Sequence, residues 1–277
     1  MSTDFPVLSE ISEPQFAIDP SSAYRSAHNY EGPGIFEMPN GEGLVITSYK
    51  TLNDLRTHPK LEAQNRSGRK GGSGPEGPLA ALSSRGPFFM NEPAHTPTAL
   101  AVYHPMSPSR NDALIGAIRS IANNAMDKIL TSGEADLVNG YAVEIATRFW
   151  LQFLGVPTEM RESFSRWSSS IVPMLAFERT DEQVTQANKS ADEMWRYLRE
   201  HYENIKDSEN KNAFHLLGAA LHASDVEKVP DNPADPIAAM TFDGIDSVAT
   251  ATANVLYTCL RHPDQLCLLY TSPSPRD

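Results

Sequence analysis

The stretch that decides the fold is Phe242-Asp243-Gly244-Ile245-Asp246-Ser247-Val248-Ala249-Thr250. It lies inside a long apolar helical pattern, from Pro236 to Leu260, which ends before Pro263. Two carboxylates, a glycine and two hydroxyls stand where a buried helix usually carries only Leu, Ile and Ala. Burying such groups costs free energy unless they meet partners or serve chemistry. The stretch therefore indicates both the central helix of the fold and a candidate site.

The predicted helix over 236–260 has two faces of different composition. One face is mainly apolar: Ile237, Met240, Gly244, Val248, Thr252, Val255 and Cys259. The other is polar: Asp243, Ser247, Thr250 and Asn254. Asp246 precedes Ser247 directly in the sequence. Asp235 is expected to cap the helix, with Pro236 in its first position. The polar face has two interpretations, a solvated stripe or a chemical site.

Three more helical patterns precede this one, and their apolar stripes are expected in the core. The first stripe is Leu114, Ile118, Ile121, Ala125 and Ile129. The second is Val138, Tyr141, Ile145, Phe149 and Phe153, with Asp136 as its predicted cap and Gly155-Val156-Pro157 as its predicted end. The third is Ala187, Ala191, Met194, Leu198, Tyr202 and Ile205.

The N-terminal part has a different pattern. Residues 35–38 and 44–47 predict a hairpin whose turn contains Asn40-Gly41, and a short helix is predicted from Tyr49 to Thr57. The segment from Gly68 to Pro87 is rich in Gly, Pro and Ser, which favours a surface loop. One small sheet followed by many helices predicts a mainly α domain with a minor β part.

Composition excludes several classes of protein. The chain has 277 residues, 40% of them hydrophobic, which suffices for a sizeable core. Two cysteines exclude a disulfide scaffold and a zinc site with several thiolates. A net charge of −12 argues against nucleic acid as a partner. The sequence has neither a secretory leader nor an apolar run of about 20 residues that could span a membrane, so we expect a cytoplasmic protein.

The run Asp243-Gly244-Ile245-Asp246-Ser247-Val248 resembles the oxygen-activating helix of the haem-thiolate monooxygenases, the cytochrome P-450 family, which reads Ala/Gly-Gly-x-Asp/Glu-Thr-Thr. The resemblance covers residues 15 to 266 and is best between Met240 and Gln265. It implies a cytochrome P-450-like helical fold of the bacterial soluble type, with heme b as cofactor. It also implies that the segment 68–87 is a substrate-access loop.

The resemblance assigns a role to each residue of the polar stretch. Asp246 and Ser247 match the family's acid–alcohol pair, which relays protons to iron-bound O₂ through an ordered water. Gly244 is expected to let the helix backbone approach the flat macrocycle. Two residues depart from the pattern, because Ser247 replaces a Thr and Asp243 replaces a small residue. Asp243 would place a charge near the haem.

A second resemblance lies at Phe88 to Thr96, which is similar to the family's segment ending Pro-Pro-x-His-Thr. Continuing without gaps, Met106-Ser107-Pro108 falls on the family's Phe-Thr/Ser-Pro. The match implies that a protonated His95 pairs with a haem propionate. A local hydrogen bond at a helix start is the alternative for such a histidine. The family's Arg four residues later is replaced by Ala99.

The family's Glu-x-x-Arg helix and Phe-x-x-Gly-x-x-x-Cys haem loop do not occur in this sequence. Cys259 lies within the predicted helix and Cys267 follows it too closely, so neither is predicted to be the thiolate ligand, and no metal ligand is assigned. We therefore expect residues 1–266 to be a partial cytochrome P-450 domain without its C-terminal third, and the fragment to be inactive. Residues 267–277 resemble a translated sequencing adapter and are predicted to be a tail foreign to the family.

The predicted function of the parent protein is that of a haem-dependent monooxygenase. It would insert one atom of O₂ into an apolar small molecule, with electrons from a ferredoxin- or flavodoxin-type donor. The first alternative is a helical small-molecule-binding or scaffold protein without haem. A weaker alternative is a hydrolase that uses Asp243 and Asp246 as its carboxylates.

Overall fold

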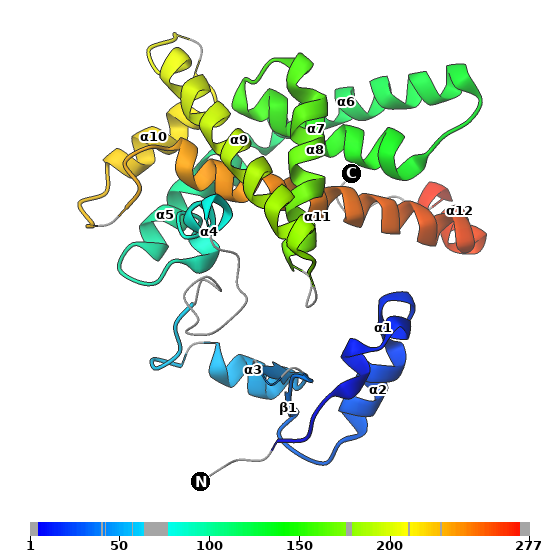
Figure 1. Ribbon diagram of the computed structural model, residues 1–277. Coiled ribbons are helices and arrows are strands. Elements are labelled where there is room, and N and C mark those ends of the chain that lie inside the picture. Colours follow the sequence, from blue (N-terminus) through cyan, green and yellow to red (C-terminus); the bar gives the residue numbers. More distant parts are fainter. Residues whose placement is uncertain are drawn as a thin grey trace. The chain divides into compact units, whose positions relative to one another are not determined.

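The computed structural model describes residues 5–39, 41, 43–56, 58–63, 77–175, 179–209, 211–227 and 229–271. The chain divides into two compact units (Figure 1). Among the described residues, the N-terminal unit comprises 5–63 and the helical unit comprises 77–271. Each unit has its own apolar core.

The N-terminal unit is built around a two-stranded sheet. Strands β1 (Ile35–Glu37) and β2 (Leu44–Ile46) pair antiparallel, with Phe36 opposite Val45, so the predicted hairpin is confirmed. Gly41 has a φ of +71°, as its turn requires, and Asn40 lies outside the described residues. The remaining elements of this unit are η1 (Ser9–Ser12), α1 (Pro14–Ile18), α2 (Ser21–Asn29) and α3 (Tyr49–Leu55).

The short helix predicted from Tyr49 to Thr57 is confirmed as α3 over most of its length. It begins at Tyr49, where the Thr51 N–H donates to the Ser48 side chain at 3.3 Å, and it ends at Leu55. Thr57 lies outside the described residues.

The helical unit confirms the prediction of a mainly α fold. Its longer helices are α6 (Asn111–Ser132), α7 (Val143–Leu154), α8 (Arg161–Ile171), α9 (Asp181–Ile205) and α11 (Ala234–Arg261). Its shorter ones are α4 (Pro78–Ser83), α5 (His95–Tyr103), α10 (Ala213–His222) and α12 (Pro263–Thr271). Single turns complete it: η3 (Pro87–Phe89), η4 (His104–Met106), η5 (Pro108–Arg110), the π-helical η6 (Leu137–Ala142), η7 (Thr158–Met160) and η8 (Val172–Leu175).

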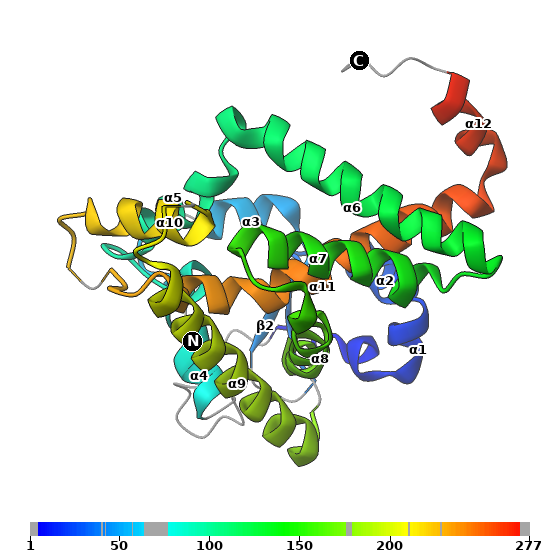
Figure 2. The ribbon, with the colours of Figure 1, turned by 90° about the horizontal axis from the view of Figure 1, so that it is seen from above.

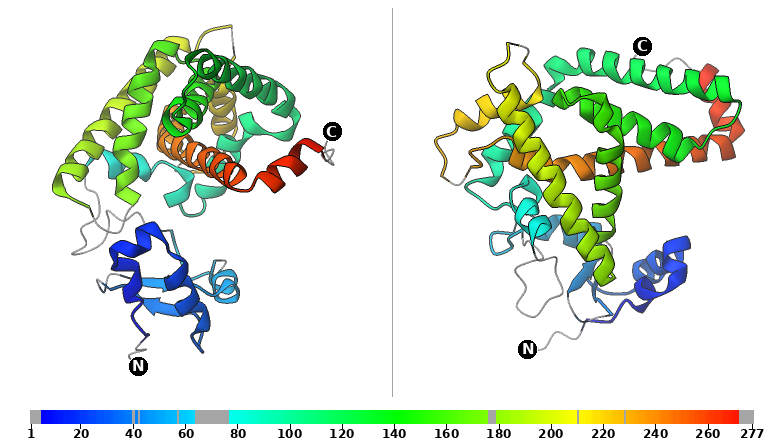
Figure 3. Two further views of the ribbon diagram at one scale, coloured as in Figure 1. Left: turned by 90° about the vertical axis from the view of Figure 1, so that its right-hand side faces the viewer. Right: turned by 45° about the horizontal axis from the view of Figure 1, so that its top comes forward.

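Helix α11 is the central element of this unit. It packs against α7, α8, α9 and α4, and α6 lies beside α7 (Figure 2). The paired helices α8 and α9 cross α11, as Figure 3 shows. The first half of α11 is almost entirely buried, from Ala234 to Phe242. A long apolar helix with neighbours on several sides is what the sequence pattern predicted for this segment.

The expected apolar stripes are buried to different extents. The α9 stripe is core at Ala187, Ala191, Met194 and Leu198. The other two stripes are only partly buried, because Ile118 is 39% exposed and Val138 is 52% exposed. These two side chains are exposed rather than buried, so their prediction as core was wrong.

The predicted bounds of the helix that follows Asp136 are confirmed. The Asp136 carboxylate accepts the N–H groups of Val138 and Asn139, each at 2.9 Å. The helix ends where Gly155 takes a φ of +66°. Between these points the chain forms first η6 and then α7.

The surface loop predicted for 68–87 requires a correction in its second part. Residues 78–83 form α4, which buries Leu79 and Leu82 and packs against α9. The Leu79 N–H donates to the Asn188 side-chain oxygen of α9 at 3.0 Å. The apolar run that starts at Leu79 thus supplies a helix with a face to bury, although glycine, proline and serine surround it. Residues 68–76 lie outside the described part of the chain.

The predicted start of α11 also requires a correction. The helix begins at Ala234, and Asp235 is its second residue, buried to 5% exposure. The Asp235 carboxylate accepts from Arg199 at 2.7 and 2.8 Å and from Trp195 Nε1–H at 2.8 Å, and Arg85 lies 3.2 Å away. The Ala234 N–H instead donates to the Asn232 side chain at 2.9 Å. Asp235 therefore ties α9 to α11 and does not cap α11.

Candidate functional site

The polar turn of α11 is formed by Asp243, Asp246 and Ser247. Both carboxylates are partly buried, whereas Ser247 is exposed. The opposite side of the same turn is anchored in the core, since Ile245 is 2% and Ala249 is 4% exposed. Further along the helix, Thr250 and Asn254 are exposed. The structure therefore confirms a polar face on α11. Its residues are partly buried at Asp243 and exposed at Ser247, Thr250 and Asn254.

The two carboxylates of the polar turn share an unusual environment. Burial, reinforced by the negative charge of Asp246, raises the pKa of Asp243 above its ordinary value. Burial alone raises the pKa of Asp246. Neither carboxylate has a hydrogen bond or ion pair with another described residue, and none joins Asp246 to Ser247. Partial desolvation without a compensating cation makes both groups weaker acids than a solvated aspartate.

These raised pKa values predict a pH-dependent stability. A carboxyl whose pKa is higher in the folded than in the unfolded state binds protons more tightly when folded, so stability falls as pH rises from 3.8 through the raised pKa. Replacing Asp243 by Asn is expected to raise the urea midpoint at neutral pH, and this gain should shrink as the pH approaches 3.8. Tryptophan fluorescence would follow unfolding, with the exposed Asp127→Asn as the control. A gain that is constant with pH would contradict the assignment.

Gly244 faces Trp150 of α7, and its expected role beside a macrocycle stays a prediction. A Cβ atom at this position would lie 2.3 Å from Trp150 Cζ2 and 2.8 Å from Trp150 Nε1. The Trp150 ring is 5% exposed and packs edge-on against Phe153. The glycine is therefore required by the close packing of α11 on α7. Its position gives no support to the expectation that it lets the helix approach a macrocycle.

A Gly244→Ala substitution is expected to destabilise the fold by about 2 kcal/mol, because overpacking against Trp150 outweighs the better helix propensity of alanine. Gly116 of α6 is the matched control, since a Cβ there would meet nothing within 4 Å. Gly116→Ala should stabilise by about 0.5–1 kcal/mol. Urea unfolding of both variants measures the difference, and equal effects would rule out the close contact.

A buried contact that the sequence did not predict holds the backbone of the polar turn. The Ser168 hydroxyl of α8 donates to the Phe242 carbonyl of α11 at 2.8 Å. In a regular helix this carbonyl is also the acceptor for the Asp246 N–H. Ser168 therefore fixes the turn that carries both carboxylates. Its place in a run of three serines, 168–170, gave no signal that one of them is buried.

His95 is the first residue of α5 and makes the local contact that was its alternative interpretation. Its Nδ1 lies 3.4 Å from Glu92 Oε1, and its side chain is 44% exposed. Glu92 also accepts a hydrogen bond from the Thr96 hydroxyl, which lowers the pKa of Glu92. Ala99, at the position of the family's arginine, is partly buried within α5. A propionate contact for His95 stays a prediction.

The two cysteines lie on the last two helices. Cys259 is partly buried in α11 and Cys267 is exposed on α12. The described residues contain no group of three or more His, Cys, Asp or Glu side chains placed to hold a metal ion. None of the helices in the described chain is long and apolar enough to cross a membrane. Helix α12 runs from Pro263 across Leu266 to Thr271, and the foreign origin of residues 267–277 stays a prediction.

Comparison with known proteins identifies curated relatives of this chain. The chain is 26% identical to the vitamin D(3) 25-hydroxylase of Pseudonocardia autotrophica, over 92% of this chain and 61% of that protein. It is 20% identical to the biotin biosynthesis cytochrome P450 of Bacillus subtilis, over 70% of this chain and 49% of that protein. The chain is related to the cytochrome P450 proteins. No family model matches it.

Solved cytochrome P450 structures share the fold. P450BioI in complex with an acyl-ligated acyl carrier protein superposes with a TM-score of 0.79 at 19% identity, over 94% of this chain and 66% of that one. CalO2 gives 0.75 at 20% identity, over 94% and 64%. The chain thus spans about three-fifths of the length of the first of its curated cytochrome P450 relatives. The polar turn of α11 is the part on which the resemblance to the family's oxygen-activating helix rests.

Proposed function

We propose that this chain is part of a haem-dependent monooxygenase of the bacterial soluble type, which inserts one atom of O₂ into an apolar organic substrate. One observation carries the proposal. Asp246, half-buried on the central helix and without a charged partner among the described residues, has a raised pKa and is followed in the sequence by Ser247. An acid and an alcohol side by side are what proton delivery to a reacting oxygen needs.

We propose that a haem would lie beside the polar turn of α11, with His95 at its propionate edge. The two uncompensated carboxylates lie on one turn of α11, and His95 offers a partly exposed ring nitrogen for a propionate. Haem iron, when bound, supplies the centre at which O₂ is held and reduced. The axial thiolate of the family is not assigned to Cys259 or Cys267, and we propose that the 277-residue chain is inactive for this reason.

The side chains in and around the polar turn have different roles in the proposed proton transfer. Asp246 would take up and release the proton at its carboxyl oxygen, and burial makes it a weaker acid than a solvated aspartate. The Ser247 hydroxyl accepts that proton through a water and passes it on towards the substrate side. Ser168 keeps the Phe242 carbonyl, and with it the turn, in a fixed position. Asp243 retains a proton of its own more readily than a solvated aspartate, because burial and the charge of Asp246 raise its pKa.

The proposed partners follow from this chemistry. The substrate is an apolar small molecule, O₂ is the second substrate, and electrons come from a separate donor of the ferredoxin or flavodoxin type. We place the protein in the cytoplasm, where such donors are found. The relatives include a vitamin D(3) 25-hydroxylase and a 6-deoxyerythronolide B hydroxylase, which supports hydroxylation of an organic compound as the reaction class.

The alternative functions have less support. A haem-free binding or scaffold protein would explain why neither cysteine is placed as a haem ligand, but it gives no reason for two uncompensated carboxylates on the central helix. A hydrolase based on Asp243 and Asp246 needs a nucleophile or base next to them, and among the described residues none is hydrogen-bonded to either carboxylate.

Oxygen labelling of the intact protein tests the proposal. The purified protein, an electron donor and a panel of apolar compounds would be incubated under ¹⁸O₂, and the products analysed by mass spectrometry. We expect one labelled oxygen atom in each product. Labelling from H₂¹⁸O in place of O₂, or an intact protein that purifies without haem, would refute the monooxygenase.

A further inference from the structure

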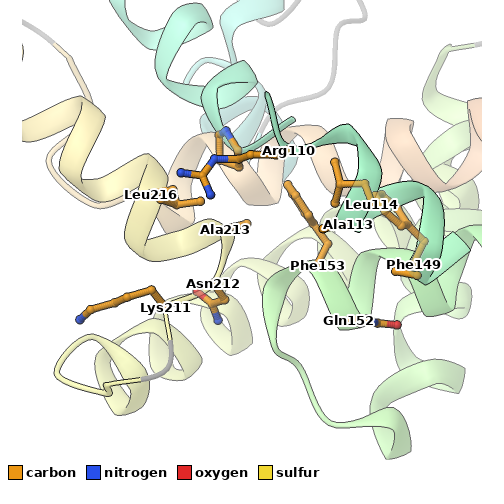
Figure 4. A pocket seen from close by; sticks show the side chains of 12 residues that line it. Arg110, Ala113, Leu114, Phe149, Gln152, Phe153, Lys211, Asn212, Ala213 and Leu216 are labelled. Carbon is orange, nitrogen blue, oxygen red and sulfur yellow. The ribbon is translucent and has the colours of Figure 1, made fainter. Parts of the chain in front are cut away.

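A cavity of about 280 Å³ lies away from the polar turn, between α6, α7 and α10 (Figure 4). Its walls come from the end of η4 and η5, the first two turns of α6, the last two turns of α7 and the first turn of α10. None of its described lining residues belongs to α8, α9 or α11, the helices around the polar turn. It is therefore a separate site that the proposed monooxygenase reaction does not use.

The inner wall of this cavity is apolar and aromatic. The rings of Phe149 and Phe153 are stacked, with centroids 5.5 Å apart and planes inclined by 18°. Leu114, Ala117 and Leu216 complete the wall. In Figure 4 the Phe153 side chain points into the space between α6 and α10. A volume near 280 Å³ is close to the lower end of ligand pockets, about 300 Å³, which suits a short aliphatic chain or a single ring.

The rim of the cavity is positively charged. Arg110 and Lys211 are both lining residues, and none of the described lining residues is acidic. The Lys211 ammonium donates to the Ser208 carbonyl at 2.8 Å and points away from the cavity (Figure 4). The Arg110 guanidinium has no hydrogen bond or ion pair with another described residue, and it extends towards Leu216 across the rim (Figure 4). Arg110 is thus the cation that is free to meet a ligand.

The backbone adds to this positive potential. Two helices, α6 and α10, begin at the cavity, and the N-terminal end of a helix carries a partial positive charge. Asn212 caps α10, whereas α6 begins at Asn111, directly after Arg110, and has no side-chain cap hydrogen bond. The uncapped first turn of α6 and the Arg110 guanidinium therefore contribute positive potential on the same side of the cavity.

We propose that this cavity binds a small organic carboxylate with an apolar chain. The carboxylate accepts two parallel N–H bonds from Arg110, the geometry that a guanidinium favours, and the chain lies along the Phe149–Phe153 stack. The ammonium group of an amine of the same length would be repelled by the Arg110 guanidinium, and an alcohol would leave the charge of Arg110 unpaired. We therefore expect the cavity to bind the carboxylate more tightly than the amine or the alcohol of the same length.

Calorimetric titration of the full 277-residue chain with octanoate tests the proposal, with octan-1-ol and octylamine as probes of the same length. We expect saturable binding of octanoate alone. Arg110→Gln should weaken it by about tenfold, because one charge-assisted contact is lost. Arg119→Gln is the matched control, since Arg119 is exposed on the same helix but does not line the cavity. It should change affinity by less than about twofold.

A second variant tests the cavity itself. Ala117→Phe fills the space while leaving Arg110 in place, and we expect it to abolish octanoate binding with an unchanged helical circular dichroism spectrum. Binding that survives this variant would place the ligand elsewhere. Equal losses in Arg110→Gln and Arg119→Gln, equal affinity for octylamine, or no binding of octanoate to the parent chain would each overturn the proposal.

Discussion

Replacing Asp246 by asparagine in the intact protein is expected to slow product formation by about a hundredfold while leaving the substrate affinity unchanged. The amide keeps the size and hydrogen-bonding reach of the carboxyl but cannot release a proton. Asp246 is half-buried, and burial raises its pKa, so the protein loses a carboxyl that binds a proton more tightly than a solvated aspartate does. Product formation at saturating substrate and the substrate dissociation constant are the two quantities to measure.

Asp243→Asn is the comparison for this experiment. Asp243 lies on the same turn, is also partly buried and also has a raised pKa, but it does not match the acid of the family's acid–alcohol pair. We expect its loss to reduce turnover by much less than the loss of Asp246. Equal rates in the Asp246→Asn variant and the parent protein would refute the relay, and equal losses in both variants would indicate a general electrostatic effect.

Replacing Asp235 by alanine is expected to destabilise the fold by about 3 kcal/mol. Asp235 is 5% exposed and is the shared acceptor for Arg199 and Trp195, with Arg85 beside it. Both guanidiniums also lie over the Trp195 ring, at 4.8 and 4.9 Å from its centroid. Removing the carboxylate would leave two cations and an indole N–H without their acceptor, at the junction of α9 and α11.

The size of this effect distinguishes the two roles considered for Asp235. A helix cap would lose only about 1 kcal/mol on replacement by alanine. Asp181, in the exposed first turn of α9, is the control, and its replacement should change stability by less than about 0.5 kcal/mol. Urea unfolding at neutral pH measures all three proteins. A loss near 1 kcal/mol for Asp235→Ala would restore the capping role.

The difference between prediction and structure at Asp235 has a general physical basis. The sequence pattern identified the long helix, because apolar periodicity reports on which side of a helix is buried. It placed Asp235 at the cap, since aspartate before proline at a helix start is a common arrangement. The partners that bury Asp235 are 36 and 40 residues away in the sequence. Local patterns carry no information about such contacts.

The same limit applies to the candidate site. Asp246 and Ser247 were predicted from their match to the acid–alcohol pair of the resembled family, and their role stays a prediction. The packing reason for Gly244 is a tryptophan on α7, and the anchor of the turn is a serine on α8. Helix α4 was missed because glycines and prolines outweighed a short apolar run whose burial depends on α9. Each miss involves a residue that is explained only by a distant partner.

The central claim is that the parent protein is a haem-dependent monooxygenase, and the native coding sequence downstream of the Leu266 codon tests it most directly. The chain spans 61% of the length of a curated cytochrome P450 relative, so a haem loop encoded beyond this codon is the specific expectation. We expect an in-frame Glu-x-x-Arg segment and then a Phe-x-x-Gly-x-x-x-Cys loop. A native reading frame that continues or closes without that cysteine loop would contradict the claim and favour the haem-free binding protein.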